Sequence, residues 1–169
     1  MVREKQIKLP TSKWHQIPKI ISIAYKLKPK SILDIGIGSG KYGLLMKEYV
    51  RPDILDGVEA FEPYLGDVQK SIYDNIYVED ITKMDIPKYD LYLLIDVLEH
   101  IEKEKGKELL KKLKGRVIVA MPKNIEVDEK LNQERIKDHG NKYGVHVSSW
   151  TAKELGGKDY SEKSLVVCI

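Results

Sequence analysis

Two hydrophobic patterns alternate along the 169-residue chain: short apolar runs and stretches with helical spacing. The short runs are rich in β-branched residues, which is typical of strands. They lie at Ser31–Ile35, Ile54–Glu59, Asn75–Val78, Leu91–Ile95, Arg116–Ala120 and Leu165–Ile169. The helical spacing falls between them, at Gly40–Tyr49, Pro63–Ser71, Leu98–Lys114 and Trp150–Leu155. Alternation of this kind predicts an α/β fold built from βαβ units around a mostly parallel sheet.

Two of the predicted strands, at 91–95 and 117–120, are apolar without a break, as is typical of strands buried on both faces. Residues 17–27 carry apolar side chains at helical spacing and predict a leading helix that packs on the sheet. By contrast, residues 122–143 are dense in charged and amide side chains. A connection this long in a small chain predicts a functional lid or a mobile loop.

Composition narrows the class of protein. With 42% hydrophobic and 33% charged residues the chain can close one core, and its length suits a single domain. No run approaches the roughly 18 apolar residues of a membrane-spanning helix, and the first residues lack the apolar segment of a secretory signal. We therefore expect a cytoplasmic protein without membrane contact.

The single cysteine, Cys168, excludes a cysteine-based zinc site, and no metal site is predicted. The abundance of Lys and Glu is met in heat-adapted proteins.

A glycine-rich turn follows the first predicted strand and precedes a predicted helix. Gly36, Gly38 and Gly40 let the chain reverse tightly and let a ligand approach the backbone. The phosphate-binding loop of nucleoside triphosphatases does not fit, because Ile35 and Tyr42 stand where that loop needs a glycine and a hydroxyl residue. The turn therefore predicts a nucleotide-like ligand held by another glycine-loop chemistry.

Two glycine-loop chemistries remain. The dinucleotide fingerprint G-x-G-x-x-G fits Gly38, Gly40 and Gly43, with Glu59 at about the usual 20 residues downstream. An NAD(P)-binding oxidoreductase therefore stays an alternative. However, Asp34 ends the strand beside the turn, where a carboxylate would repel a pyrophosphate. Its charge favours a ligand that carries an ammonium or a sulfonium at this point.

The stretch from Leu33 to Gly40 reads L-D-I-G-I-G-S-G and resembles the first motif, LDIGxGxG, of the class I S-adenosylmethionine-dependent methyltransferases. Further matches follow in the family's order at Gly57–Phe61, Val78–Ile81, Tyr89–Ile101 and Arg116–Pro122. One of them contains D-V-L-E-H at 96–100, the fourth-strand signature of one branch of the family. The resemblance covers residues 31–120. It implies a three-layer Rossmann-like methyltransferase fold, here shortened at the C-terminus, and methyl transfer from S-adenosyl-L-methionine.

The resemblance also implies roles for single residues. Glu59 would hold both ribose hydroxyls, Ala60 and Phe61 would lie beside the adenine, and Asp80 would accept from the adenine amino group. All the residues implied to bind the cofactor are Asp34, Gly36, Ile37, Gly38, Gly40, Glu59, Ala60, Phe61, Asp80, Ile81 and Asp96. They fall at strand ends, where open α/β sheets bind ligands.

The sequence indicates the methyl acceptor less clearly than it indicates the cofactor. His100 and His146 are the candidates for a catalytic role, against a plain structural role at the start of a helix or in a pocket wall. The net charge of +3 is spread along the chain rather than clustered, and position 96 onward lacks the Asn/Asp-Pro-Pro-aromatic motif of enzymes that methylate bases. Both observations favour a small-molecule acceptor over nucleic acid.

We expect one methyltransferase-like domain over 1–169, with an N-terminal helical segment (1–30), a cofactor-binding core (31–120) and an acceptor-side loop with C-terminal strands (121–169). Acceptor recognition then falls to the first 30 residues, to the loop after Pro122, or to a partner subunit, including a second copy in a homodimer. The alternative from another class is a non-catalytic subunit that binds the cofactor or a related nucleoside.

Overall fold

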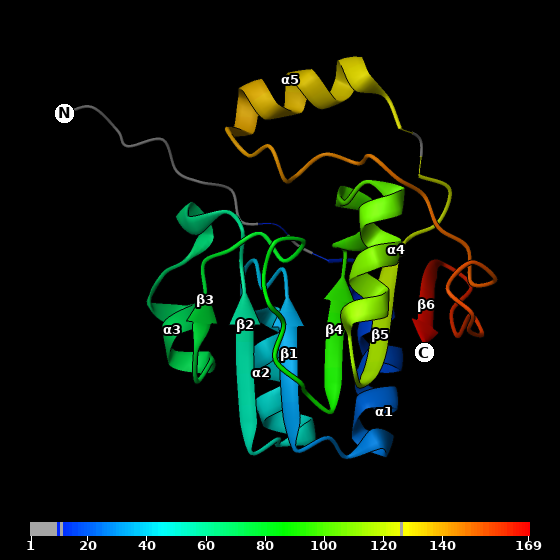
Figure 1. Cartoon of the computed structure of the whole chain (residues 1–169). Helices are drawn as coiled ribbons and strands as arrows, with labels where there is room; N and C mark the ends of the chain where they lie inside the picture. Colours follow the sequence, from blue (N-terminus) through cyan, green and yellow to red (C-terminus); the bar gives the residue numbers. More distant parts are fainter. Residues whose placement is uncertain (1–9, 11, 126) are drawn as a thin grey trace.

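A six-stranded sheet organises the part of the chain that the computed structural model describes, namely residues 10, 12–125 and 127–169. The strand order is β3-β2-β1-β4-β5-β6 (Figure 1). The strands are β1 (Ser31–Ile35), β2 (Ile54–Val58), β3 (Ile76–Tyr77), β4 (Leu91–Ile95), β5 (Arg116–Pro122) and β6 (Ser164–Cys168). All neighbours pair in parallel except β5 and β6, which are antiparallel. The predicted mostly parallel α/β sheet is confirmed.

Helices cover both faces of this sheet, which gives three layers (Figure 1). One face packs against α1 (Ile17–Leu27), α2 (Lys41–Leu45) and α3 (Asp67–Ile72). The other face packs against α4 (Lys103–Lys112) and the segment around Trp150. Short 3-10 turns lie at Trp14–Gln16, Glu62–Tyr64 and Leu98–His100, and a π-helical turn at Met46–Val50 continues α2.

Alternation along the central strand explains the two cores. In β4, Leu91, Leu93 and Ile95 point to the α1–α2 face, whereas Tyr92 and Leu94 point to the α4 face. Successive side chains of a strand point to opposite faces. Because both faces are covered, the strand must be apolar throughout, which is what its sequence predicts.

The parallel register brings the carboxyl ends of three strands together. Ile35 pairs with Val58 of β2 and with Leu94 of β4, so β1, β2 and β4 end side by side. The residues that follow these strands therefore meet at one edge of the sheet. In an open α/β sheet this edge is where ligands bind.

One predicted helix is wrong, and one helix of the structure is not predicted. The segment 122–143, expected as a lid or loop, contains α5 (Glu129–His139), which Asp128 caps by accepting from the Leu131 N–H and which ends at Gly140 with a φ of 67°. This helix lies over the carboxyl ends of the strands (Figure 1). The helix expected at Trp150–Leu155 is only a turn, because Gly156, with a φ of 71°, stops it.

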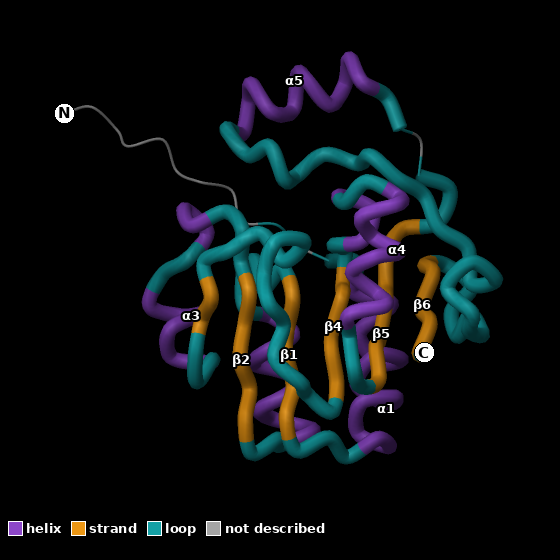
Figure 2. Tube along the Cα trace, in the orientation of Figure 1, coloured by secondary structure: helices purple, strands orange, loops and turns teal. Residues whose placement is uncertain are grey.

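The remaining boundaries shift by a few residues. The predicted helix at 98–114 is divided, since a 3-10 turn at 98–100 precedes α4. Between α5 and β6 the chain is mostly loop, apart from an isolated bridge from Asp159 to Val167 (Figure 2). None of the helices in the described part of the chain is long and apolar enough to cross a bilayer.

Candidate active site

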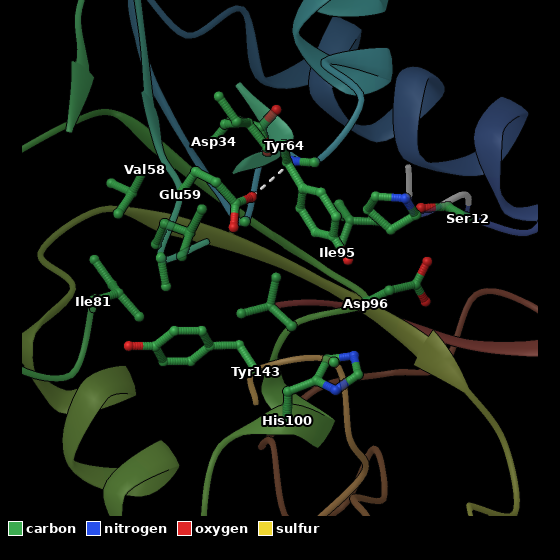
Figure 3. A pocket seen from close by; sticks show the side chains of 18 of the residues that line it. Ser12, Asp34, Val58, Glu59, Tyr64, Ile81, Ile95, Asp96, His100 and Tyr143 are labelled. Carbon is green, nitrogen blue, oxygen red and sulfur yellow. Dashed lines mark hydrogen bonds between the residues drawn. The ribbon is translucent and has the colours of Figure 1, made fainter. Parts of the chain in front are cut away.

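A cavity of about 390 Å³ lies at the carboxyl ends of β1, β2 and β4. Its walls come from the glycine turn, from the residues after β2 and β4, from Pro10, Ser12 and Lys13, and from the loop 141–146. Figure 3 shows Asp34 and Glu59 on one side of this cavity and His100 and Tyr143 on the other. The cavity therefore joins the predicted cofactor residues to the two predicted histidines.

The structure brings most of the predicted site residues together. The predicted cofactor residues that line the cavity are Asp34, Gly36, Ile37, Gly38, Glu59, Ala60, Asp80, Ile81 and Asp96. Both His100 and His146 line it as well. Gly40 and Phe61 do not. Gly40 is the N-cap residue just before α2, with a φ of 78°, and the Phe61 ring packs edge-on against Tyr64, with ring centroids 4.8 Å apart.

The glycine turn is closely packed against its neighbours. Gly36 and Gly38 have φ values of 76° and 47°, which residues other than glycine rarely adopt. A Cβ on Gly36 would collide with Val97, and one on Gly38 would come within 2.8 Å of Pro10. The turn therefore presents bare backbone to the cavity, with Pro10 packed against Gly38.

Asp34 is buried beside this turn. The Asp34 side chain is 2% exposed and accepts a 2.6 Å hydrogen bond from the Tyr73 hydroxyl. Burial raises the pKa of Asp34 to about 7; the Tyr73 hydrogen bond opposes this rise and the nearby Glu59 charge adds to it. Asp34 is thus a carboxyl group that a cationic ligand would hold in its charged form.

Glu59 connects the end of β2 to the glycine turn. Its carboxylate accepts from the Gly38 N–H at 2.9 Å and from the Phe61 N–H at 2.9 Å. Burial raises its pKa, and these backbone hydrogen bonds oppose that rise. A carboxylate offers about four lone-pair positions. Three backbone N–H groups, those of Phe61, Gly38 and Ala60, hydrogen-bond to it, so Glu59 retains acceptor capacity toward the cavity that it lines.

Asp96 follows β4 and contacts the N-terminal segment. It has a left-handed φ of 54° and accepts a 3.1 Å hydrogen bond from Nε2 of the fully buried Gln16. Burial raises the pKa of Asp96. On the same side of the cavity, Lys41 Nζ donates to the Ser12 carbonyl at 3.2 Å. Ser12 is thus held by Lys41, just after the glycine turn, and Gln16 is held at the end of β4.

Asp80 lies at the edge of the cavity and is partly exposed. Its Oδ1 accepts from the Thr82 N–H at 3.0 Å and from the Thr82 hydroxyl at 2.7 Å. Asp80 therefore shapes the turn that carries the buried Ile81. The predicted contact between Asp80 and an adenine amino group stays a prediction.

Glu99, His100 and His146 form a group that the sequence analysis does not predict. One potential ligand atom from each residue lies within 4.8 Å of the other two. Glu99 is fully buried, and neither of its carboxylate oxygens has a hydrogen-bond partner in the described part of the chain. Burial raises its pKa well above the usual range, and the nearby Asp96 charge adds to this. The ring centroids of His100 and His146 are 5.0 Å apart.

Several residues that support the site carry no sequence signal. Tyr73 holds Asp34, and Gln69 Nε2 donates to the Gly38 carbonyl at 2.7 Å. Across the cavity, Asn141 Nδ2 donates to the Tyr64 hydroxyl at 2.9 Å. A single tyrosine or glutamine on an amphipathic helix looks like ordinary packing. Only the fold shows that these side chains reach the turn.

The cavity lining is acid-rich. Its carboxyl groups come from Asp34, Glu59, Glu79, Asp80, Asp96 and Glu99, whereas Lys13 and Lys41 are its only lysines or arginines among the described residues. In their ionised form, which a bound cation favours, these carboxyl groups attract cations and repel phosphate groups. The cavity therefore suits a positively charged ligand.

No protein-family model matches the sequence, and a search of curated proteins finds no match. Solved structures do match. An S-adenosylmethionine-dependent methyltransferase from Archaeoglobus fulgidus has a TM-score of 0.59 at 18% identity, covering 84% of this chain and 64% of that one. An rRNA methylase from Escherichia coli has a TM-score of 0.57 at 18% identity, covering 91% and 62%.

A third match is the plantazolicin methyltransferase BpumL in complex with SAH, with a TM-score of 0.55 at 18% identity, covering 85% of this chain and 62% of that one. The chain thus spans less than two thirds of the length of each of these proteins. The names of the last two proteins point to different acceptors, so the likeness does not identify an acceptor for this chain. The sheet order, the glycine turn and these matches show that the chain has the fold of the class I S-adenosylmethionine-dependent methyltransferases.

Proposed function

We propose that this chain is an S-adenosylmethionine-dependent methyltransferase that acts on a small molecule. The observation that carries the proposal is the buried carboxyl of Asp34 beside the glycine turn, within an acid-rich cavity. This arrangement suits a ligand with an ammonium and a sulfonium and no phosphate. It opposes the oxidoreductase alternative, because a dinucleotide would place its pyrophosphate against Asp34.

The residues present fit the cofactor. At Gly36 and Gly38 a Cβ would collide with Val97 and Pro10, so only bare backbone fits beside the ligand there, and Asp34 would face the cofactor's amino group. Glu59 has spare acceptor capacity for the ribose hydroxyls, while its hydrogen bond to the Gly38 N–H keeps the two binding elements in register. When bound, the cofactor supplies an electrophilic methyl group on sulfur.

The protein's contribution to such a transfer is position and exclusion of water. Methyl transfer is accelerated largely when donor and acceptor are held in line near contact distance. One wall of the cavity comes from Pro10, Ser12 and Lys13 and another from the loop 141–146, and hydrogen bonds from Gln16 to Asp96 and from Asn141 to Tyr64 hold these two segments. These two segments would shape the space for the acceptor.

A small acceptor is favoured by the size and charge of the cavity. Small-molecule pockets usually have volumes of about 300–1,000 Å³, and this cavity, at about 390 Å³, is near the lower limit. Nucleic-acid binding depends on basic groups that neutralise phosphates. The lining offers six carboxyl groups against two lysines, which disfavours a phosphate backbone at this entrance.

The test is methyl transfer from S-adenosylmethionine that carries a labelled methyl group. The purified chain is incubated separately with small-molecule, RNA and protein fractions of a cell extract, with Glu59→Gln as the inactive control. We expect label in the small-molecule fraction only with the unaltered chain. Label in RNA or protein would overturn the proposed acceptor class. Cofactor binding without label in any fraction would favour the non-catalytic subunit.

A further inference from the structure

Three side chains with metal-binding atoms converge at one wall of the cavity. Glu99 and His100 lie in the 3-10 turn after β4, and His146 lies in the loop after α5. Their ligand atoms lie within 4.8 Å of one another. Two bonds of about 2.1 Å to one ion span at most about 4.2 Å, so small side-chain rotations would bring all three onto one ion.

Glu99 is the unusual member of this group. It is fully buried, and neither carboxylate oxygen has a hydrogen-bond partner within the described residues. A buried polar group that has no hydrogen-bond partner destabilises the fold. Such groups in a native structure are often completed by an ion or another ligand. Because Glu99 lines the cavity, a cation bound there would be coordinated by its carboxylate and would supply the missing partner.

The backbone around the three side chains holds them in place. The Glu99 carbonyl accepts from the N–H groups of Val147 and Ser148, at 2.8 and 3.1 Å. These bonds join the turn after β4 to the loop that carries His146. On the other side of that loop, Asn132 Nδ2 of α5 donates to the His146 carbonyl at 2.7 Å. The three groups therefore come from a fixed scaffold.

His100 has the hydrogen bond that metal ligands typically have. Its Nδ1 lies 2.8 Å from the Val145 carbonyl, and because a carbonyl only accepts, Nδ1 must carry the proton. In the neutral ring the lone pair is then on Nε2. Histidines that bind metals usually donate their other ring N–H to a backbone carbonyl or a carboxylate in this way.

From these observations we infer that Glu99, His100 and His146 form a binding site for a divalent transition-metal ion such as Zn²⁺. Two imidazoles and one carboxylate are a donor set that suits such ions better than Mg²⁺, which prefers oxygen ligands. Three protein ligands leave a coordination position open. Because all three residues line the cavity, that position faces the space next to the cofactor residues.

The open position defines a class of acceptor, an inference that rests on the proposed function. An acceptor hydroxyl that binds the ion becomes more acidic and releases its proton to solvent water. Its oxygen then forms the new bond to the methyl carbon as the sulfur–carbon bond breaks, and the sulfur keeps the bonding pair as a neutral thioether. The site therefore favours methylation of an oxygen that can ligate a metal.

The first experiment is calorimetric titration of the full metal-free chain with ZnCl₂. We expect one Zn²⁺ per chain, bound more tightly than Mg²⁺. Glu99→Gln, His100→Ala and His146→Ala should each weaken Zn²⁺ binding by about tenfold to a hundredfold or more. The matched control is His15→Ala, because His15 lies outside the group and bonds to Ser164 at 2.8 Å; it should bind Zn²⁺ as the unaltered chain does.

A thermal unfolding curve and a titration with S-adenosylmethionine distinguish a variant that does not fold from a variant that has lost only the metal site. His146 lies in a partly exposed loop, so His146→Ala should keep both. The inference is overturned if the unaltered chain shows no saturable Zn²⁺ binding, or if His146→Ala binds Zn²⁺ as tightly as His15→Ala does.

The acceptor class has its own test. In the labelled-cofactor assay, removal of metal by a chelator should abolish methyl transfer while S-adenosylmethionine still binds, and added Zn²⁺ should restore the transfer. Transfer that persists in the metal-free chain would contradict a role of the ion in the reaction. Failure of the chain to bind S-adenosylmethionine would instead contradict the proposed function and leave the Zn²⁺ titration as a separate result.

Discussion

The Tyr73 hydroxyl donates a 2.6 Å hydrogen bond to the Asp34 carboxyl, which is 2% exposed. Tyr73 follows α3 on one side of the sheet, and Asp34 lies within β1, so the bond joins two elements 39 residues apart. Hydrogen bonds to charged groups contribute about 1.5–3 kcal/mol. Tyr73 is therefore a positioning residue that helps Asp34 stay charged when a cation binds.

Removal of this hydroxyl should weaken cofactor binding. We expect Tyr73→Phe to bind S-adenosylmethionine about tenfold to a hundredfold more weakly, since the buried Asp34 carboxylate loses its donor. Calorimetry at pH 8 measures the change. Tyr25→Phe, at a tyrosine that is 61% exposed on α1, is the matched control. Equal affinity of the two variants would show that the Tyr73 bond has no part in binding.

Cofactor binding should depend on pH through Asp34. Burial raises its pKa to about 7, so the empty site is largely protonated below that pH and has lost the charge that attracts a cation. Around Asp34, the hydroxyls of Tyr42 and Tyr73 stay neutral, because burial raises their pKa values further. Burial also raises the pKa of Glu59.

Affinity for S-adenosylmethionine should therefore fall by up to about tenfold per pH unit as the pH drops from 7 to 5. Asp34→Asn should bind weakly and with a much flatter pH profile, measured by the same calorimetry. A profile in the unaltered chain that does not change between pH 5 and 8 would contradict the assignment of Asp34.

The raised pKa of Asp34 also predicts how the stability of the cofactor-free chain changes with pH. A carboxyl whose pKa is raised on folding stabilises the fold at pH values below its ordinary pKa, and that stabilisation is lost as the pH rises through about 7. Without cofactor, Asp34→Asn should gain stability relative to the unaltered chain between pH 5 and pH 8, by about 3 kcal/mol. Urea unfolding at the two pH values measures it, and a constant difference would refute the shift.

The glycine turn offers a matched pair of substitutions. Gly36 and Gly156 have similar φ values, 76° and 71°, so an alanine is strained at either position. Only at Gly36 would the new Cβ collide with a neighbour, Val97; at Gly156 nothing lies within 4 Å. Gly36→Ala should lose cofactor binding and about 2–4 kcal/mol of stability, and Gly156→Ala about 1 kcal/mol with binding intact. Similar effects in both would contradict the close packing of the turn.

Glu59 has a comparable control in Glu62, an exposed acid on the adjacent 3-10 turn that does not line the cavity. Glu59→Gln should weaken S-adenosylmethionine binding at least tenfold, since the neutral amide is a poorer acceptor for both the ribose hydroxyls and the Gly38 N–H. Glu62→Gln should bind normally. Calorimetry measures the affinity of both variants for S-adenosylmethionine. Unchanged affinity in Glu59→Gln would show that Glu59 does not bind the cofactor.

The sequence predicts the sheet well because its signals are local. β1 and β4 match their predicted bounds, since a buried parallel strand is apolar over its whole length. The prediction at 150–155 was wrong although a helix start is present: Thr151 and Glu154 exchange capping hydrogen bonds. Two glycines at 156 and 157 end the turn at once.

The residues of the candidate site also differ in whether a local pattern in the sequence predicts them. Acids at strand ends, such as Asp34 and Glu59, are visible in the sequence because the register of parallel strands brings such ends together. Contacts between distant segments are not visible. Nothing local shows that Tyr73 reaches Asp34, or that a loop after α5 places His146 beside Glu99.

The central claim is tested most directly by calorimetric titration of the full chain with S-adenosylmethionine and, separately, with NAD⁺ at pH 8. The acid-rich lining and the carboxyl of Asp34 predict saturable binding of one S-adenosylmethionine per chain, with NAD⁺ bound far more weakly. Tighter binding of NAD⁺, or no binding of S-adenosylmethionine, would contradict it.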